Sequence, residues 1–333
     1  ILEDEIGDAR VRANVGLHRG QRLPHGGLID ADGRRRVRDV GSERTDVLHT
    51  RGAARDGMSD AVGRSADGWY RSGMNVDIGF VTQIGMDHRT AVAIAADHGY
   101  DYVEVMLDGA GARDRLAPRR DELRTALADH GVGCTVHLPF GSIDPGSPFD
   151  AVRSGAVAEL EAHLDLAAAI GATKATLHPT TDAWAPAHDD GSVGDAIVES
   201  VRHLDGYAAD RDVELVAENV PKGRFDTNRI DELLDRTDVS MCLDTGHARV
   251  DGRDDGGIAS LIDAHADRIS HFHLNDVRRP SDEHLPIGAG FVDFERLFQA
   301  LPGDWTGTLS VEVFTHDADY LGHSIDRVDE SLS

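Results

Sequence analysis

The chain has few cysteines and no long apolar run. Only Cys134 and Cys242 occur among 333 residues, each inside an apolar stretch, so we expect buried free thiols rather than a disulfide framework. No apolar run approaches the roughly 20 residues of a bilayer-spanning helix, so we expect a soluble protein without membrane contact. The first strand-like segment, VDIGFVTQIGMDH, is too poor in glycine to form a dinucleotide-binding turn.

Basic residues are scarce after residue 73. Residues 1–73 hold 13 Arg and 12 acidic residues, which leaves 21 basic and 48 acidic residues in the remaining 260. Lys174 and Lys222 are the only lysines, and the acidic residues are dispersed. This composition resembles that of haloarchaeal cytoplasmic proteins, which stay soluble where salt screens charge, so we expect a cytoplasmic location. The alternative is an acidic surface that binds a basic partner. Such a surface would be expected to contain runs of acidic residues, whereas the acidic residues here are dispersed.

The first 73 residues lack sustained periodicity of either kind. We interpret 1–73 as a poorly ordered or non-native extension, and translation from upstream of a true start at Met74 explains its different charge best. A genuine flexible extension that binds nucleic acid is the alternative, but a net charge near +1 makes this weak. The predicted catalytic domain is 74–333.

Eight short apolar runs alternate with amphipathic stretches after residue 75. The runs are 76–81, 102–107, 133–138, 173–178, 213–218, 239–244, 269–274 and 308–313. Helical stretches such as RTAVAIAADHG and AVAELEAHLDLAAAIG end in a glycine suited to a left-handed C-cap. This count over about 260 residues predicts an α/β fold, a (β/α)8 TIM barrel. A doubly wound open sheet is the rival.

Polar side chains occupy the carboxyl ends of these runs, where a barrel places its active site. The candidates are His137, His178, Glu218, Asp244, His247, His273, Asp282, His284 and Glu312. Alone, each would more often be a hydrogen-bonded core or loop residue. Burying several carboxylates together costs several kcal/mol unless a cation or protons compensate, so the set predicts a metal site.

Three neighbouring polar residues have simpler interpretations. His271 lies two residues deeper than His273, so we expect an ordinary buried histidine. Asp276 is expected to cap a turn, and His316 to start the last helix. The remaining set offers carboxylate and imidazole but no thiolate. A divalent ion is therefore expected, with Mn²⁺ and Zn²⁺ as the main candidates and Mg²⁺ or Co²⁺ as alternatives.

The order of short motifs along the chain resembles a known superfamily, the xylose isomerase-like TIM barrels. These include sugar phosphate isomerases and epimerases, and the endonuclease IV family of apurinic-site nucleases (AP endonuclease family 2). The resemblance covers roughly 76–330. It rests on VHLPF, LHPT, AENV, CLDTGH, HLND, DEHLPIGAG and VEVF, which are weak singly but specific in this order.

The two branches of the superfamily imply different uses of the same residues. In the nuclease branch all nine candidates would hold three zinc ions. In the isomerase branch Glu218, Asp244, His273 and Glu312 would hold one ion, and the two glutamates would exchange protons with the substrate. His247 would then orient a substrate hydroxyl. His137, His178, Asp282 and His284 would be further metal or substrate ligands.

Several departures favour the isomerase branch. VHLPFGSIDPGSP lacks the Pro-Tyr and the Asn-Leu-rich DNA-entry loop of the nucleases. CLDTGH has Gly246 where the nucleases usually have Cys, and GAG replaces their Gly-Glu-Gly. No basic stripe is present for phosphates. We therefore predict a metal-dependent isomerase or epimerase of a sugar or sugar phosphate that acts through an enediolate. An apurinic-site phosphodiesterase with nucleic acid as partner, or another metal-dependent lyase, is the alternative. The sequence leaves a homo-oligomer open.

Overall fold

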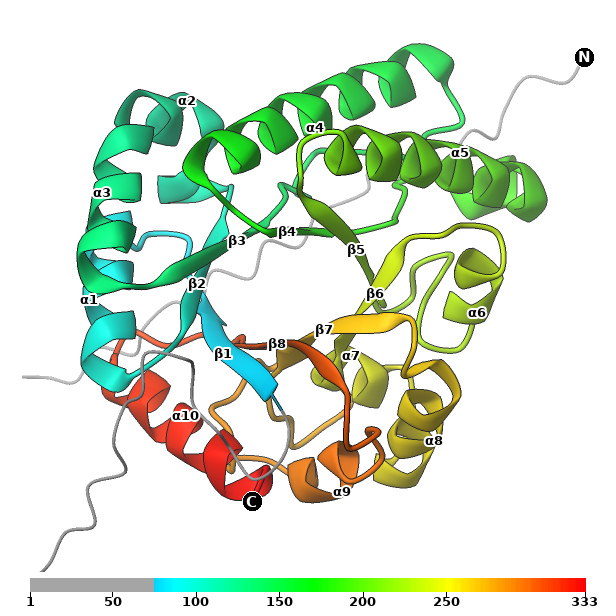
Figure 1. Ribbon diagram of the computed structural model, residues 1–333. Helices are drawn as coiled ribbons and strands as arrows, with labels where there is room; N and C mark the ends of the chain where they lie inside the picture. The colour runs from blue at the N-terminus through cyan, green and yellow to red at the C-terminus, as the bar shows by residue number, and fades with distance from the viewer. Residues whose placement is uncertain (1–74) are drawn as a thin grey trace, which may run out of the picture. The chain divides into compact units, whose positions relative to one another are not determined.

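Eight parallel strands form a closed barrel in the computed structural model, which describes residues 75–333 (Figure 1). Each strand pairs with the next along the chain, and β1 pairs with β8 to close the sheet. The strands are β1 (Asn75–Val81), β2 (Tyr102–Met106), β3 (Gly133–His137), β4 (Lys174–Leu177), β5 (Glu214–Glu218), β6 (Ser240–Asp244), β7 (Ile269–Leu274) and β8 (Thr306–Val311). The predicted barrel and all eight strands are confirmed.

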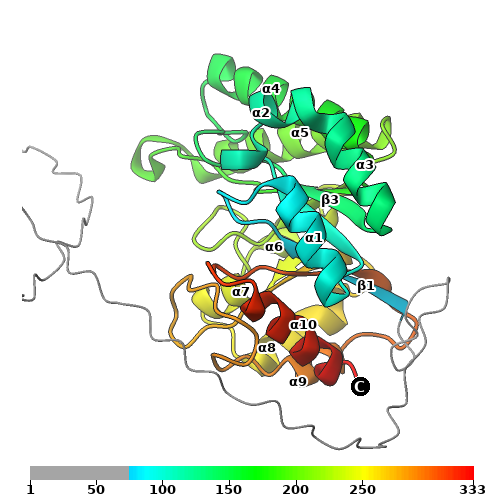
Figure 2. The ribbon, with the colours of Figure 1, turned by 90° about the vertical axis from the view of Figure 1, so that its left-hand side faces the viewer.

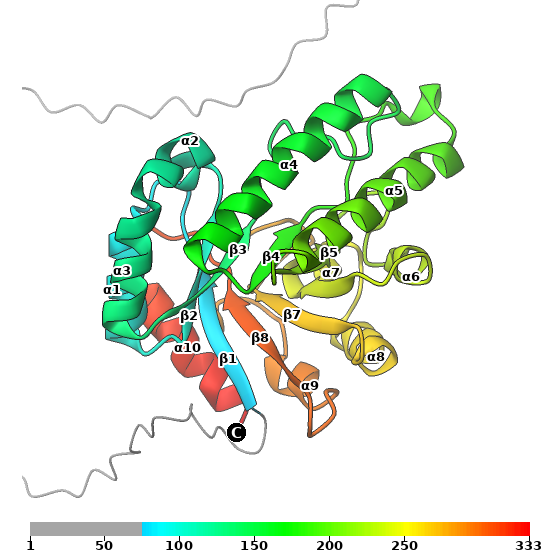
Figure 3. The same cartoon turned by 45° about the horizontal axis from the view of Figure 1, so that its top comes forward.

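Helices surround the barrel on the outside. They are α1 (His88–His98), α2 (Arg113–Leu116), α3 (Arg120–His130), α4 (Asp150–Ile170), α5 (Asp190–Ala209), α6 (Ile230–Leu234), α7 (Thr245–Val250), α8 (Asp255–His265), α9 (Phe294–Phe298) and α10 (Asp319–Ser331), with 3₁₀ turns η1 (Gly109–Gly111), η2 (Ala117–Arg119) and η3 (Ala185–Ala187). Figure 2 shows α1, α3 and α10 along one side, and Figure 3 shows α4 beside α5.

Two predicted glycine caps end long helices. Gly99 follows α1 with φ 80°, and Gly171 follows α4 with φ 83°. This left-handed backbone favours glycine because it has no Cβ. The chain can therefore turn sharply from a helix back into the next strand, and the barrel connections stay short at this end.

Strand residues alternate between an apolar layer and the barrel interior. In β2, Val103 and Val105 belong to the apolar core that packs against the helices, while Glu104 between them faces inward. In β6, Met241 and Leu243 lie in the core, while Cys242 and Asp244 point inward. This period of two places the main hydrophobic layer between strands and helices. Many of the inward-facing side chains, such as Glu104 and Asp244, are polar.

Both cysteines are free and buried in the structure, as predicted. Within residues 75–333, no helix has the length and apolarity that crossing a bilayer would require. The proposed extension over 1–73 and the proposed start at Met74 lie outside the described residues.

Candidate metal centre

Four strands bring four ligand-type side chains to one point at their carboxyl ends. Glu218 is the last residue of β5, Asp244 the last of β6, His273 lies one residue before the end of β7, and Glu312 follows β8. Each offers one ligand atom, and these atoms all lie within 4.8 Å of one another. All four side chains are buried. The four residues predicted for a single ion therefore lie together.

His273 stands between two glutamates. Its Nδ1 atom is 3.1 Å from Glu312 Oε2 and 3.5 Å from Glu218 Oε2. These three atoms are buried, and although their contacts are close, none of the three makes a hydrogen bond of acceptable geometry. An unsatisfied buried polar atom costs about 1–3 kcal/mol, so three such atoms that converge are expected to share a ligand. A divalent cation fits this arrangement, because carboxylate oxygens and an imidazole nitrogen are its usual ligands.

The electrostatics of the group also favour a cation. Burial, together with Glu312 and Glu218, raises the pKa of Asp244 to about 6, although His247 acts in the opposite direction. Burial opposes ionisation of Glu312, but His273 and His284 lower its pKa to about 2. The crowded carboxylates thus depend on nearby positive charge to ionise. A divalent ion would supply that charge at their common point.

Two more histidines lie beside Glu218. His178 Nε2 is 3.1 Å and His137 Nε2 is 3.5 Å from Glu218 Oε2. His137 is the last residue of β3, whereas His178 lies one residue beyond the end of β4, not in it as predicted. The exposed ring of Phe140 stacks on His178 with centroids 4.5 Å apart. This second group shares its carboxylate with the first.

A third group contains His247, Asp282 and His284. Asp282 Oδ1 is 2.8 Å from His284 Nε2 and 3.6 Å from His247 Nε2. His247 Nδ1 is also 3.0 Å from Glu218 Oε1. Burial works against charge on His284, yet Glu312 and Asp282 help to raise its pKa to about 9. All nine predicted residues therefore lie at one end of the barrel, in three adjoining groups.

Asp276 organises the loop that supplies Asp282 and His284. Its carboxylate accepts hydrogen bonds from the backbone N–H groups of Val277, Gly288, Gly290 and Val292, at 2.7–3.1 Å. The loop also pairs Asp276 with Leu285 in an antiparallel bridge. His284 adopts φ 44°, which is unusual for a residue with a Cβ. The expected turn cap is thus confirmed, and it extends over the whole loop.

Of the other two simple interpretations, the structure confirms the one for His271. His271 is buried and hydrogen-bonds to Thr308 and Glu104. It lies near Cys242 and His273 in a further ligand-type group, but burial raises the pKa of the Cys242 thiol, which disfavours a thiolate ligand. His316 is exposed and does not start the last helix as predicted, because α10 begins three residues later at Asp319.

Two asparagines that sequence reasoning did not single out hold Asp244 in place. Asn275 Nδ2 donates to Asp244 Oδ2 at 2.8 Å. Asn219 Oδ1 accepts from the Asp244 backbone N–H at 2.7 Å, and Asn219 Nδ2 donates to the Asp244 carbonyl at 3.1 Å. Asn219 lies in AENV directly after Glu218, and Asn275 lies in HLND two residues after His273. Their positions in those motifs are the only sequence signal.

Gly246 has no side chain, and this leaves space for Asn275 beside Asp244. We therefore predict that adding a side chain at Gly246 weakens metal binding. A Cβ at Gly246 would lie 1.8 Å from Asn275 Oδ1. Gly246→Ala should displace Asn275 from Asp244 and weaken Zn²⁺ binding about 10–100-fold, the usual effect of losing support behind a ligand. Competition with a chelator measures the affinity. Gly141→Ala is the control, because nothing lies within 4 Å of that Cβ. Unchanged affinity in Gly246→Ala would contradict this account of Asp244.

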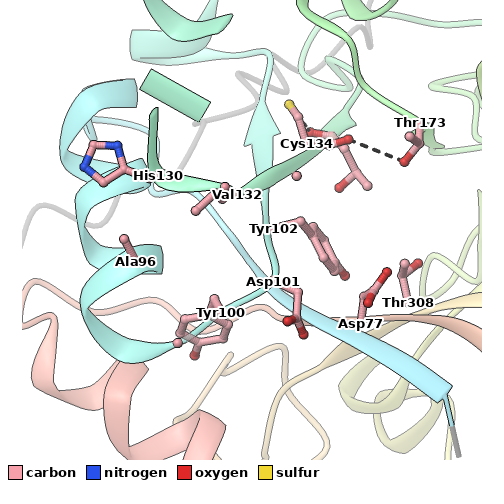
Figure 4. A pocket seen from close by; sticks show the side chains of 14 residues that line it. Asp77, Ala96, Tyr100, Asp101, Tyr102, His130, Val132, Cys134, Thr173 and Thr308 are labelled. Atoms are coloured by element: carbon pink, nitrogen blue, oxygen red, sulfur yellow. Dashed lines mark hydrogen bonds between the residues drawn. The ribbon is translucent and has the colours of Figure 1, made fainter. Parts of the chain in front are cut away.

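A cavity of about 400 Å³ lies at the opposite end of the barrel, at the amino ends of the strands (Figure 4). Asp77, Tyr102, Cys134 and Thr308 are among its lining residues, and none of the nine candidates is. In TIM barrels, chemistry takes place at the carboxyl ends of the strands. We therefore place the candidate site at the carboxyl ends of the strands, and not in this cavity.

Comparisons with known proteins agree with this architecture. A sequence model of the family described as "Xylose isomerase-like TIM barrel" matches residues 92–332. The chain is 28% identical to a probable endonuclease 4 of Mycobacterium leprae over 221 residues, which covers 63% of this chain and 84% of that protein.

Solved structures of similar fold include two sugar epimerases or their relatives. A D-tagatose 3-epimerase-like protein has a TM-score of 0.64 at 22% identity and covers 77% of this chain and 100% of its own. The D-allulose 3-epimerase of Methylomonas sp. has a TM-score of 0.63 at 20% identity and covers 77% of this chain and 97% of its own. At these identities the likeness shows the fold alone. The match over residues 92–332, which is more than half of the chain, shows that the protein belongs to the xylose isomerase-like TIM barrel family.

Proposed function

We propose that this protein is a divalent-metal-dependent isomerase or epimerase of a sugar or sugar phosphate. One observation carries the proposal. Glu218 at the end of β5 and Glu312 just after β8 approach His273 from different sides, and each presents a buried oxygen that makes no hydrogen bond. Two carboxylates at one buried point can remove a proton from a substrate carbon and return it. This is the chemistry of isomerisation and epimerisation next to a carbonyl.

The residues of the site have distinct roles in the proposed reaction. A divalent ion held by Glu218, Asp244, His273 and Glu312 would polarise the substrate carbonyl and the neighbouring hydroxyl. One of the two glutamates accepts the proton α to the carbonyl, and the other delivers a proton to the resulting enediolate. His247 lies 3.0 Å from Glu218 and orients a substrate hydroxyl. Burial of the site excludes water that would compete for the proton.

Charge supports a small substrate over a nucleic acid. Residues 74–333 carry 48 acidic and 21 basic residues, whereas duplex DNA is bound through Lys and Arg contacts to phosphates. Gly246, where the nuclease branch usually has Cys, has no room for a side chain beside Asn275. The same acid excess is the basis for proposing adaptation to high salt and a cytoplasmic location.

Phosphodiester hydrolysis is the second candidate, and a specific observation favours it. Two further ligand-type groups adjoin the group of Glu218, Asp244, His273 and Glu312. One contains His137 and His178 and shares Glu218 with it, and the other contains His247, Asp282 and His284. Three adjoining ligand groups are what a three-zinc nuclease centre would need. The likeness to a probable endonuclease 4 supports the same candidate.

A paired assay separates the two candidates. The purified protein, in molar salt with Mn²⁺ or Zn²⁺, is incubated with a panel of ketoses and ketose phosphates and, separately, with an abasic-site oligonucleotide. We expect conversion of at least one ketose, with solvent deuterium entering at the carbon next to the carbonyl. Strand cleavage without any ketose conversion or exchange would reject the isomerase proposal and support the nuclease.

A further inference from the structure

A buried glutamate that the sequence analysis did not single out lies directly beneath the metal centre. Glu104 is in the middle of β2 and is fully buried inside the barrel. Its Oε1 atom lies 3.1 Å from His273 Nε2, and Thr176 donates to the same oxygen at 2.8 Å. Its Oε2 atom lies 3.0 Å from His271 Nε2, and Ser310 donates to it at 2.5 Å. The carboxylate therefore has four hydrogen-bond partners on three other strands.

Burying a carboxylate in the barrel interior costs free energy of folding. Barrel interiors are usually filled with bulky branched apolar residues, and a buried charge costs several kcal/mol unless it is hydrogen-bonded and paired. Glu104 meets this condition, because each of its oxygens accepts a hydrogen bond from a hydroxyl, Thr176 or Ser310, and also contacts a histidine nitrogen. As a carboxylate it can only accept hydrogen bonds. The proton between Glu104 and His273 must then belong to the imidazole, at Nε2.

The two nitrogens of His273 thus face different environments. Nε2 contacts Glu104 in the barrel interior. Nδ1 lies on the side of Glu312 and Glu218 and makes no hydrogen bond. A proton fixed at Nε2 leaves the Nδ1 lone pair free for a metal ion. Hydrogen bonds from a carboxylate to the far nitrogen of a ligating histidine commonly fix its tautomer and ring orientation.

We propose that Glu104 is a positioning residue, which holds His273 in the Nε2–H tautomer with Nδ1 aimed at the metal centre. The inference rests on the metal centre of the proposed function, but not on which reaction that centre catalyses. Glu104 would touch neither the ion nor the substrate.

The surroundings of Glu104 fix its own position. Tyr102 and Ser310 hydroxyls lie 2.8 Å apart, and Thr308 Oγ1 is 2.6 Å from His271 Nδ1. Tyr102 and Thr308 face the cavity at the opposite end of the barrel (Figure 4). The network therefore runs from that cavity to the ligand His273, and every member has a partner. Such a network gives the carboxylate one geometry.

Three variants test the inference through binding of Zn²⁺ alone. Glu104→Leu removes both acceptors, so Zn²⁺ affinity should fall about 10–100-fold. Glu104→Gln keeps a carbonyl oxygen that can accept from His273 Nε2–H, so it should restore most of the affinity. Tyr100→Phe is the control, because it removes a buried hydrogen bond to the Leu321 carbonyl far from His273. It should lower the melting temperature while Zn²⁺ affinity stays unchanged.

Nitrogen-15 spectra of the histidine rings in the Zn²⁺-loaded wild type give a second measurement. We expect a slowly exchanging proton at His273 Nε2 and a metal-shifted Nδ1, and Glu104→Leu should lose the protection of that proton. Wild-type affinity in Glu104→Leu, or a His273 that binds Zn²⁺ through Nε2, would overturn the inference. The wild-type spectrum decides the question even if Glu104→Leu fails to fold. Zn²⁺ binding weakened by Glu104→Leu in a protein without ketose activity would reject the proposed reaction alone.

Discussion

Replacing either Glu218 or Glu312 by glutamine should lower exchange of the substrate α-hydrogen with solvent by about 10²–10⁴-fold, the usual contribution of a general acid or base. Each amide keeps the shape of the side chain but cannot accept the substrate proton. Exchange into deuterium oxide, followed by mass spectrometry of the sugar, measures this step directly.

Metal content and folding must be measured on the same samples, because both glutamates are also candidate ligands. Circular dichroism should show an intact fold in both variants. Glu295→Gln, at an exposed position on α9, is the matched control and should exchange like the wild type. Full exchange in both single variants, with the ion still bound, would exclude the two-glutamate mechanism.

The number of ions separates the two candidate functions most sharply. We expect one tightly held ion per chain, bound by Glu218, Asp244, His273 and Glu312, since three of these four have unpartnered atoms at their common point. Asp282 is half-exposed and lies 2.8 Å from His284, so it has a partner without an ion. Elemental analysis after dialysis without chelator gives the count.

The double variant Asp282→Ala with His284→Ala tests the same point. It should keep the single ion and react roughly 10 to 200-fold more slowly, since a lost interaction with substrate costs about 1–3 kcal/mol. Two or three ions in the wild type, with at least one lost in the double variant, would make phosphodiester hydrolysis the better hypothesis. Glu295→Gln again serves as the unaffected control.

The sequence by itself determined the fold and the end of the barrel at which the candidate site lies. Apolar runs with a period of two, separated by amphipathic stretches, predict parallel strands joined by helices, and eight of them close a barrel. The carboxyl end of each strand can be read from its own residues, so Glu218, Asp244 and His273 could be placed on one rim. These are local properties of the chain.

Only the tertiary structure decided how those residues are grouped and what supports them. Asp282 and His284 join His247 because the loop after β7 folds back on itself through the Asp276–Leu285 bridge, and no local pattern fixes that path. Glu104 lies in YVEVM, where a polar residue between valines fits a solvent-facing position equally well. Its contact with His273, 169 residues away, exists because the closed sheet turns β2 and β7 toward the same interior. Contacts across a barrel depend on the register of every strand between them, and that register is a property of the whole sheet.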